Sequence, residues 1–119
     1  MVQIRHFQTL RLFSADVARS ASYYRQLLGV EPVEELDGFV SFVIAGVCLD
    51  ISTADEKSPA SPGGAVGYWL VDSLQAVIDR AEQLGGRAYR GPLRVEETQR
   101  TILQIQDPLG GVVGFEEAF

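Results

Sequence analysis

The stretch Thr101–Glu116, TILQIQDPLGGVVGFE, sets the pattern on which the chain is built. Two short runs rich in Ile, Val and Leu flank Asp-Pro-Leu-Gly-Gly, which is typical of a β-hairpin with a tight turn. Asp107 suits the first position of that turn, and the two glycines allow a positive φ without steric cost. A looser copy, FVSFVIAGVCLDI, lies at Phe39–Ile51. The sequence therefore predicts two hairpins.

A helix-like segment that ends in Leu-Gly precedes each hairpin. Asp16 and Asp72 stand where helix N-caps are expected, and the intervals from Asp16 to Gly29 and from Asp72 to Gly85 are equal. Each half of the chain therefore has the predicted order β-α-β-β-β. A half this short cannot close its own core, so the two copies must pack together.

These patterns give a single domain of two modules, residues 1–52 and 66–119, joined by a Pro-, Ser- and Gly-containing linker at 53–65. The predicted first strands are Gln3–Phe13 and Val66–Val71, and the predicted helices are Val17–Leu28 and Leu74–Leu84. A polar loop is predicted for Gly91–Arg100.

Bulk properties exclude several classes of protein. The 119 residues amount to one domain, of ordinary globular composition with 46% hydrophobic and 22% charged residues. A net charge of −6 argues against nucleic-acid binding, and no apolar run is long enough to span a membrane. The single cysteine, Cys48, excludes an intrachain disulfide and suits a reducing compartment. We therefore expect a cytoplasmic protein.

The segment DVARSASYYRQLLG at Asp16–Gly29 matches the pattern D-x-x-x-S-x-x-F-Y-x-x-x-L-G, with Tyr23 in the Phe position. Val71-Asp72, Leu84-Gly85-Gly86 and the Asp-Pro-Leu-Gly turn follow in the matching order. In these residues the sequence resembles the vicinal oxygen chelate superfamily of glyoxalases, bleomycin-resistance proteins and dioxygenases. The resemblance implies an α+β fold of paired βαβββ modules, a cupped eight-stranded sheet and a homodimer.

Metal-dependent members of that family place His, Gln or Glu on the first strand of each module. Counting back from the first helix puts this position at Thr9, with Gln8 and Leu10 as register alternatives. In the second module the count reaches Val66, with Tyr68 two residues further on the same face. Of these residues only Gln8 is a normal ligand for a divalent ion.

The same members carry a carboxylate four residues after the glycine of each hairpin turn. This position is Asp50 in the first module and Gly114, which has no side chain, in the second. Glu116 is two residues further on the same strand face, and His6 could take part only after a substantial slip in register. Because Gln8 and Asp50 alone fit, we expect a metal-free member without a cofactor.

Without a metal, the cup would hold a small organic ligand of aromatic or cationic character. Tyr68 and Trp69 are adjacent strand residues and face opposite ways, so only one can line the cup, and the sequence leaves open which. Alternation also turns about half of the candidate strand residues toward the helices. The candidate ligand-binding residues are Gln8, Leu10, Phe42, Cys48, Asp50, Tyr68, Trp69, Leu103 and Gly114.

The leading interpretation is a dimeric, metal-independent binding protein for a drug or metabolite, similar to bleomycin-type resistance proteins that act by sequestration. An alternative is a glyoxalase-like lyase or isomerase, or a dioxygenase, with an atypical divalent-metal site. A third is a regulatory or structural domain with an empty cup. No catalytic residue is assigned, and the linker length allows the modules to pair within one chain or across a dimer.

Overall fold

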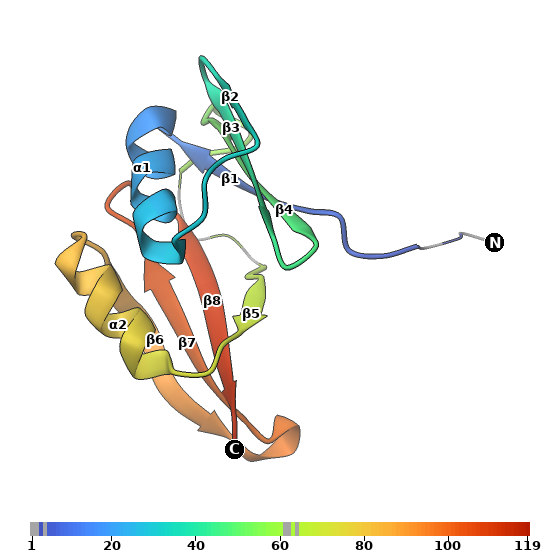
Figure 1. The fold of residues 1–119 in the computed structure, drawn as a ribbon, viewed down its shortest axis with the longest axis vertical. Helices are drawn as coiled ribbons and strands as arrows, with labels where there is room; N and C mark the ends of the chain where they lie inside the picture. Colours follow the sequence, from blue (N-terminus) through green and yellow to red (C-terminus); the bar gives the residue numbers. More distant parts are fainter. Residues whose placement is uncertain (1–2, 4, 61–62, 64) are drawn as a thin grey trace.

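The two halves of the chain fold as two copies of one β-α-β-β-β unit (Figure 1). The structure is a computed structural model, and it describes residues 3, 5–60, 63 and 65–119. The predicted α+β class and its eight strands are confirmed, but the strands form two four-stranded sheets rather than one continuous sheet.

The first unit forms a sheet in the order β1-β4-β3-β2, in which β1 runs parallel to β4 and the other neighbours are antiparallel. Its elements are β1 (Thr9–Ser14), α1 (Val17–Leu28), β2 (Glu34–Leu36), β3 (Phe39–Ile44) and β4 (Val47–Thr53). Strand β1 is shorter than the predicted strand Gln3–Phe13. It begins at Thr9, and the described residues before Thr9 are not in a strand.

The second unit repeats this topology, with the order β5-β8-β7-β6 and with β5 parallel to β8. Its elements are β5 (Tyr68–Leu70), α2 (Leu74–Gln83), β6 (Arg87–Val95), a short 3-10 helix (Glu96–Thr98), β7 (Arg100–Gln106) and β8 (Val112–Ala118). Most of the predicted polar loop is strand, because β6 continues along β7 with two register shifts before the 3-10 helix.

Helix α1 begins and ends where its sequence predicts. The Asp16 carboxylate accepts a hydrogen bond from the backbone N–H of Arg19, and Gly29 ends the helix with a φ of 66°. Helix α2 begins at Leu74 as predicted and ends one residue early, at Gln83, but its cap is Ser73 rather than Asp72, with the Ser73 hydroxyl accepting from the N–H of Ala76. Among the described residues, no helix is long and apolar enough to cross a membrane.

The turn between β7 and β8 joins the two units. The Asp107 carboxylate is buried, and its Oδ1 accepts hydrogen bonds from the backbone N–H groups of Leu109 and Gly111. Its Oδ2 accepts from the hydroxyl of Tyr24 on α1 at 2.6 Å. Burial, reinforced by the nearby Asp107 carboxylate, raises the pKa of the Tyr24 hydroxyl well above its usual value, which keeps it a donor.

The two helices contact each other on one side of the molecule, and a single hydrophobic core runs through both units (Figure 1). The sheets approach each other where Leu10 of β1 packs against Gly67, just before β5. The largest fully buried apolar side chains come from α1 and from the central strands of both sheets: Tyr24, Phe42, Leu49, Ile51, Leu103, Ile105, Val113 and Phe115.

Candidate functional site

Each sheet has one face covered by its helix and one face without a helix, which we call the open face. Helix α1 packs against β1, β3 and β4, and α2 packs against β6, β7 and β8. Phe42 of β3 pairs with Leu49 of β4, and both are fully buried on the helix side. Because side chains alternate along a strand, their neighbours Ser41 and Asp50 point to the open face.

On the open face of the first sheet, Asp50 lies between two hydrogen-bond donors. The Ser41 hydroxyl donates to Asp50 Oδ1 at 2.6 Å, and Arg11 Nη2 donates to Asp50 Oδ2 at 3.3 Å. The Arg11 guanidinium also lies 5.7 Å from the centre of the Phe39 ring. Both carboxylate oxygens are therefore occupied, and the negative charge of Asp50 is balanced by Arg11.

Gln8 and Cys48 form a smaller polar contact near the start of β1. The Gln8 side-chain amide donates to Cys48 Sγ at 3.4 Å, and the Gln8 carbonyl accepts from the Cys48 backbone N–H at 2.8 Å. Cys48 is half-buried and pairs with Thr9 and Val43 on the open face. Cys48 and Asp50 of β4 thus lie on one face of the first sheet, with Gln8 directly before β1.

The open face of the second sheet carries an aromatic ring at its centre. Tyr68 of β5 pairs with Gly114 of β8, and its ring lies so close that a Cβ at position 114 would overlap it. The Gln104 side-chain amide of β7 donates to the Tyr68 hydroxyl at 2.8 Å. One side of the ring rests on glycine backbone, and the hydroxyl is held at a fixed position.

A second Arg–carboxylate pair lies along the same open face. Arg100 Nη1 donates to Glu116 Oε1 at 3.3 Å, and Glu116 pairs with both Leu70 and Ile102 in the sheet. Each open face therefore contains one arginine that neutralises one carboxylate, and the polar groups closest to the sheet centres are uncharged or paired.

The structure divides the sequence-predicted residues between the two sides of the sheets. Phe42 and Leu103 are fully buried on the helix side, and Leu10 and Trp69 pack against the core from its edge. Of the adjacent residues Tyr68 and Trp69, it is Tyr68 that lies on the open face. The remaining predicted residues, Gln8, Cys48, Asp50 and Gly114, also belong to the open faces or their edges. Among the described residues, no hydrogen bond or ion pair joins the two open-face clusters.

The residues present do not fit a divalent ion at the positions that the family resemblance indicates. Asp50 already uses both oxygens, and the space beside Gly114 is taken by the Tyr68 ring. Glu116, the alternative ligand, pairs with Arg100. No group of three or more His, Cys, Asp or Glu side chains in the described part of the chain is arranged to hold a metal.

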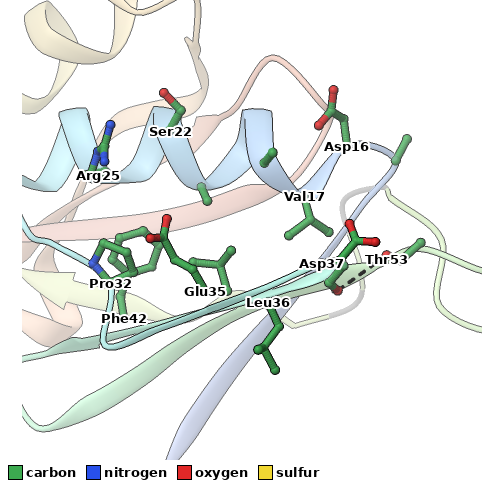
Figure 2. A pocket seen from close by; sticks show the side chains of 15 residues that line it. Asp16, Val17, Ser22, Arg25, Pro32, Glu35, Leu36, Asp37, Phe42 and Thr53 are labelled. Atoms are coloured by element: carbon green, nitrogen blue, oxygen red, sulfur yellow. Dashed lines mark hydrogen bonds between the residues drawn. The ribbon is translucent and has the colours of Figure 1, made fainter.

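Two hollows adjoin these elements. A small one of about 130 Å³ lies between the start of β1 and β5, with Leu10, Tyr68 and Trp69 in its wall. A larger one of about 540 Å³ lies on the helix side, between α1 and β2, and is shown in Figure 2. The larger cavity does not follow from the sequence, because strand alternation indicates which side chains share a face but not how far a helix lies from an edge strand.

A family model for the Glyoxalase/Bleomycin resistance protein/Dioxygenase superfamily matches residues 3–115, nearly the whole chain. The chain belongs to this superfamily. No curated protein matches the sequence.

Several solved structures share the fold at low sequence identity. A glyoxalase/bleomycin resistance protein/dioxygenase family enzyme from Burkholderia phytofirmans PsJN aligns with a TM-score of 0.78 at 15% identity, covering 94% of this chain and 98% of its own. TnmS3, an antibiotic binding protein from Streptomyces sp. CB03234, gives 0.76 at 17% identity over 100% of both chains. An Agrobacterium tumefaciens protein gives 0.77 at 22% identity over 98% and 99%. These similarities establish the fold but do not identify a ligand.

Proposed function

We propose that this superfamily member is a metal-independent binding protein that sequesters a small organic molecule on its open faces. The main observation that supports this proposal is the position of the Tyr68 ring, which lies on Gly114 and accepts a hydrogen bond from Gln104 at its hydroxyl. The position at which metal-dependent relatives would carry a carboxylate is thereby replaced by a flat aromatic surface. Such a surface stacks on an aromatic ligand with about 0.5–1.5 kcal/mol beyond the burial of area.

The charge pattern of the open faces supports an uncharged or weakly polar ligand. Arg11 and Arg100 are each paired with a carboxylate, so neither leaves an isolated charge for the ligand to compensate. Ser41, Gln8 and Gln104 supply hydrogen-bonding groups around them. The description of TnmS3 as an antibiotic binding protein supports capture of a drug-like molecule by this fold.

The proposal includes a homodimer in the cytoplasm. Several apolar side chains on or beside the open faces remain exposed in the single chain, among them Val43 at 46%, Leu70 at 66% and Leu93 at 45%. A partner copy over these faces would remove that apolar area from water and enclose the ligand. Analytical ultracentrifugation at micromolar concentration should give twice the mass of 13.0 kDa. A single species of that monomer mass would contradict the dimer.

A panel of flat aromatic antibiotics tests the binding function. Trp69 is the only tryptophan of the chain and lines the small hollow with Tyr68, so its fluorescence reports occupancy there. We expect saturable, one-to-one binding of at least one compound without chemical change and without added metal. The Tyr68→Ala variant should weaken this binding about tenfold, which corresponds to about 1.4 kcal/mol.

Tyr89→Ala is the matched control, because Tyr89 is an exposed tyrosine on the edge strand β6. This variant should bind as tightly as the unaltered protein. Equal losses in both variants would overturn the role of Tyr68. Turnover of a ligand that appears only after addition of Ni²⁺, Mn²⁺, Zn²⁺ or Fe²⁺ would overturn metal-independent sequestration in favour of an enzyme.

A further inference from the structure

The larger of the two cavities described above lies on the opposite side of the first sheet from Asp50, between α1 and the short strand β2 (Figure 2). Its volume of about 540 Å³ is within the range of about 300–1,000 Å³ that small-molecule sites occupy. The cavity exists because α1 packs over β1, β3 and β4, whereas β2 has three residues and stands at the sheet edge.

The floor of the cavity is apolar and rigid. Val17 and Ala21 of α1 face Val40 and Phe42 of β3, and all four side chains are less than 8% exposed. Pro32 adds an apolar surface at one end. Phe42 closes the floor without accessible surface of its own, so the apolar part of a ligand would be taken out of water against Pro32 and the edges of Val17, Ala21 and Val40.

The rim of the cavity is acidic. Glu35 pairs with Val40 in the sheet, so its side chain points to the helix side, and Figure 2 shows it beside Phe42 with the carboxylate directed toward α1. Asp37 and Asp16 stand toward the other end. Within the described residues Glu35 and Asp37 have no hydrogen bond or ion pair, and Asp16 uses one oxygen to cap α1.

Only one basic side chain, Arg25, lines the cavity among the described residues. Its guanidinium lies 3.6 Å from the Glu31 carboxylate, which is outside the cavity lining. Three carboxylates thus face the cavity, and none of them is neutralised by a cation of the chain within the described residues.

We propose that this cavity is a second binding site, for an organic cation that combines an apolar body with an ammonium or guanidinium group. The body packs against Pro32 and the accessible edges of Val17, Ala21 and Val40, and the cationic group donates a charge-assisted hydrogen bond to the Glu35 carboxylate. The site is independent of the open-face site, because its lining contains neither Tyr68 nor Asp50.

Three isosteric probes test the charge requirement. 4-Phenylbutylamine carries a cation, 4-phenylbutanol is neutral and 5-phenylpentanoate is an anion, while all three have the same phenylbutyl body. In amide NMR titrations the amine should give saturable shifts at Val17, Ala21 and Gly38, and the other two probes should give none over the same concentrations. Added salt should weaken the binding of the amine, because the carboxylates are at the surface.

A pair of adjacent variants tests the role of Glu35. Glu35→Gln should weaken binding of the amine about tenfold, because it removes the charge from the hydrogen bond. Glu34→Gln is the matched control, since Glu34 pairs with Ser41 and points to the open face. Equal effects of the two variants, or equal binding of amine and alcohol, would overturn the proposal.

The two proposed sites can fail separately. Tyr68→Ala should leave the affinity for phenylbutylamine unchanged, and Glu35→Gln should leave binding of the aromatic antibiotics unchanged. Amine-induced shifts confined to Tyr68 and Gln104 would assign the cation to the open face and overturn the second site while leaving sequestration intact.

Discussion

At Asp107, one buried carboxylate connects the β7–β8 turn to α1. Its oxygens accept hydrogen bonds from the turn N–H groups of Leu109 and Gly111 and from the hydroxyl of Tyr24 on α1. The sequence predicts the turn, because Asp-Pro-Leu-Gly-Gly is a local pattern. The partner on α1 is far away in sequence, and only the packing of the two units reveals it.

The neighbouring tyrosines of α1 should differ sharply in their contribution to stability. Tyr24→Phe removes the donor to Asp107 and leaves a buried charge with one partner fewer, so the free energy of unfolding should fall by about 1.5–3 kcal/mol. The Tyr23 hydroxyl is buried and has no hydrogen-bond partner among the described residues. Tyr23→Phe should therefore be neutral or slightly stabilising. Urea unfolding of both variants measures the difference, and equal losses would show that Asp107 does not depend on Tyr24.

Gly114 shows how far a single residue can be interpreted from sequence. By the family pattern, its position after the second turn is one where metal-dependent members carry a carboxylate, and glycine has no side chain there. The reason is tertiary, because the Tyr68 ring from another strand lies where a side chain at 114 would begin. Sequence places Tyr68 two residues after Val66 on one strand face, but neither the register with β8 nor the contact with Gln104 follows from local pattern.

At the scale of elements, the local sequence identifies the capping residue of a helix when one strong cap is present. It does not do so when two adjacent residues could both act as the cap. Helix α1 has Asp16 and Gly29 and is bounded as predicted. At α2, Asp72 and Ser73 are both good caps. Ser73 is the cap in the structure, where the next N–H, of Leu74, donates to Glu117 of β8.

Replacing each of the two candidate caps of α2 by alanine should separate them. Ser73→Ala should lower the free energy of unfolding by about 1 kcal/mol, because the N–H of Ala76 loses its acceptor. Asp72 is exposed and makes no side-chain hydrogen bond within the described residues, so Asp72→Ala should change stability by less than about 0.5 kcal/mol. Thermal unfolding of the two variants would contradict the assignment if Asp72→Ala proved the more damaging.

The second half of strand β6 was predicted as loop, for a reason that belongs to its place in the sheet. Its centre is Arg90-Gly91-Pro92, and glycine followed by proline is typical of a loop. As the outer strand of its sheet, β6 pairs only with β7 and has an edge free of a partner strand, where proline is tolerated. The two register shifts absorb the residues that do not fit the ladder.

On the scale of the whole molecule, the repeat predicts two units and eight strands but not the relation between the sheets. The sheets remain separate ladders, with Leu10 against Gly67 at their junction. The open-face residues were identified in part, since alternation groups them but does not say which group faces the helices. The acidic cavity was not identified, because it depends on the distance of α1 from an edge strand.

The stability of the whole molecule should fall at alkaline pH because of the α1 tyrosines. Burial and the Asp107 carboxylate raise the pKa of both Tyr23 and Tyr24 above the usual value of about 10. In the unfolded chain both hydroxyls ionise near pH 10, whereas the folded protein keeps their protons. The folded state then binds more protons than the unfolded state, and the stability falls as pH rises from about 10 through the folded pKa values.

Each tyrosine should contribute a slope of up to about 1.4 kcal/mol per pH unit in that range. Urea unfolding between pH 8 and pH 11, measured about every half pH unit, gives the slope directly. The chain has four tyrosines and a single lysine, Lys57, so few other side chains lose protons in the same interval. The double variant Tyr23→Phe/Tyr24→Phe should lose most of the slope, and Tyr89→Phe should keep it. An equally steep fall in the double variant would mean that alkaline unfolding begins outside the junction between α1 and the β7–β8 turn.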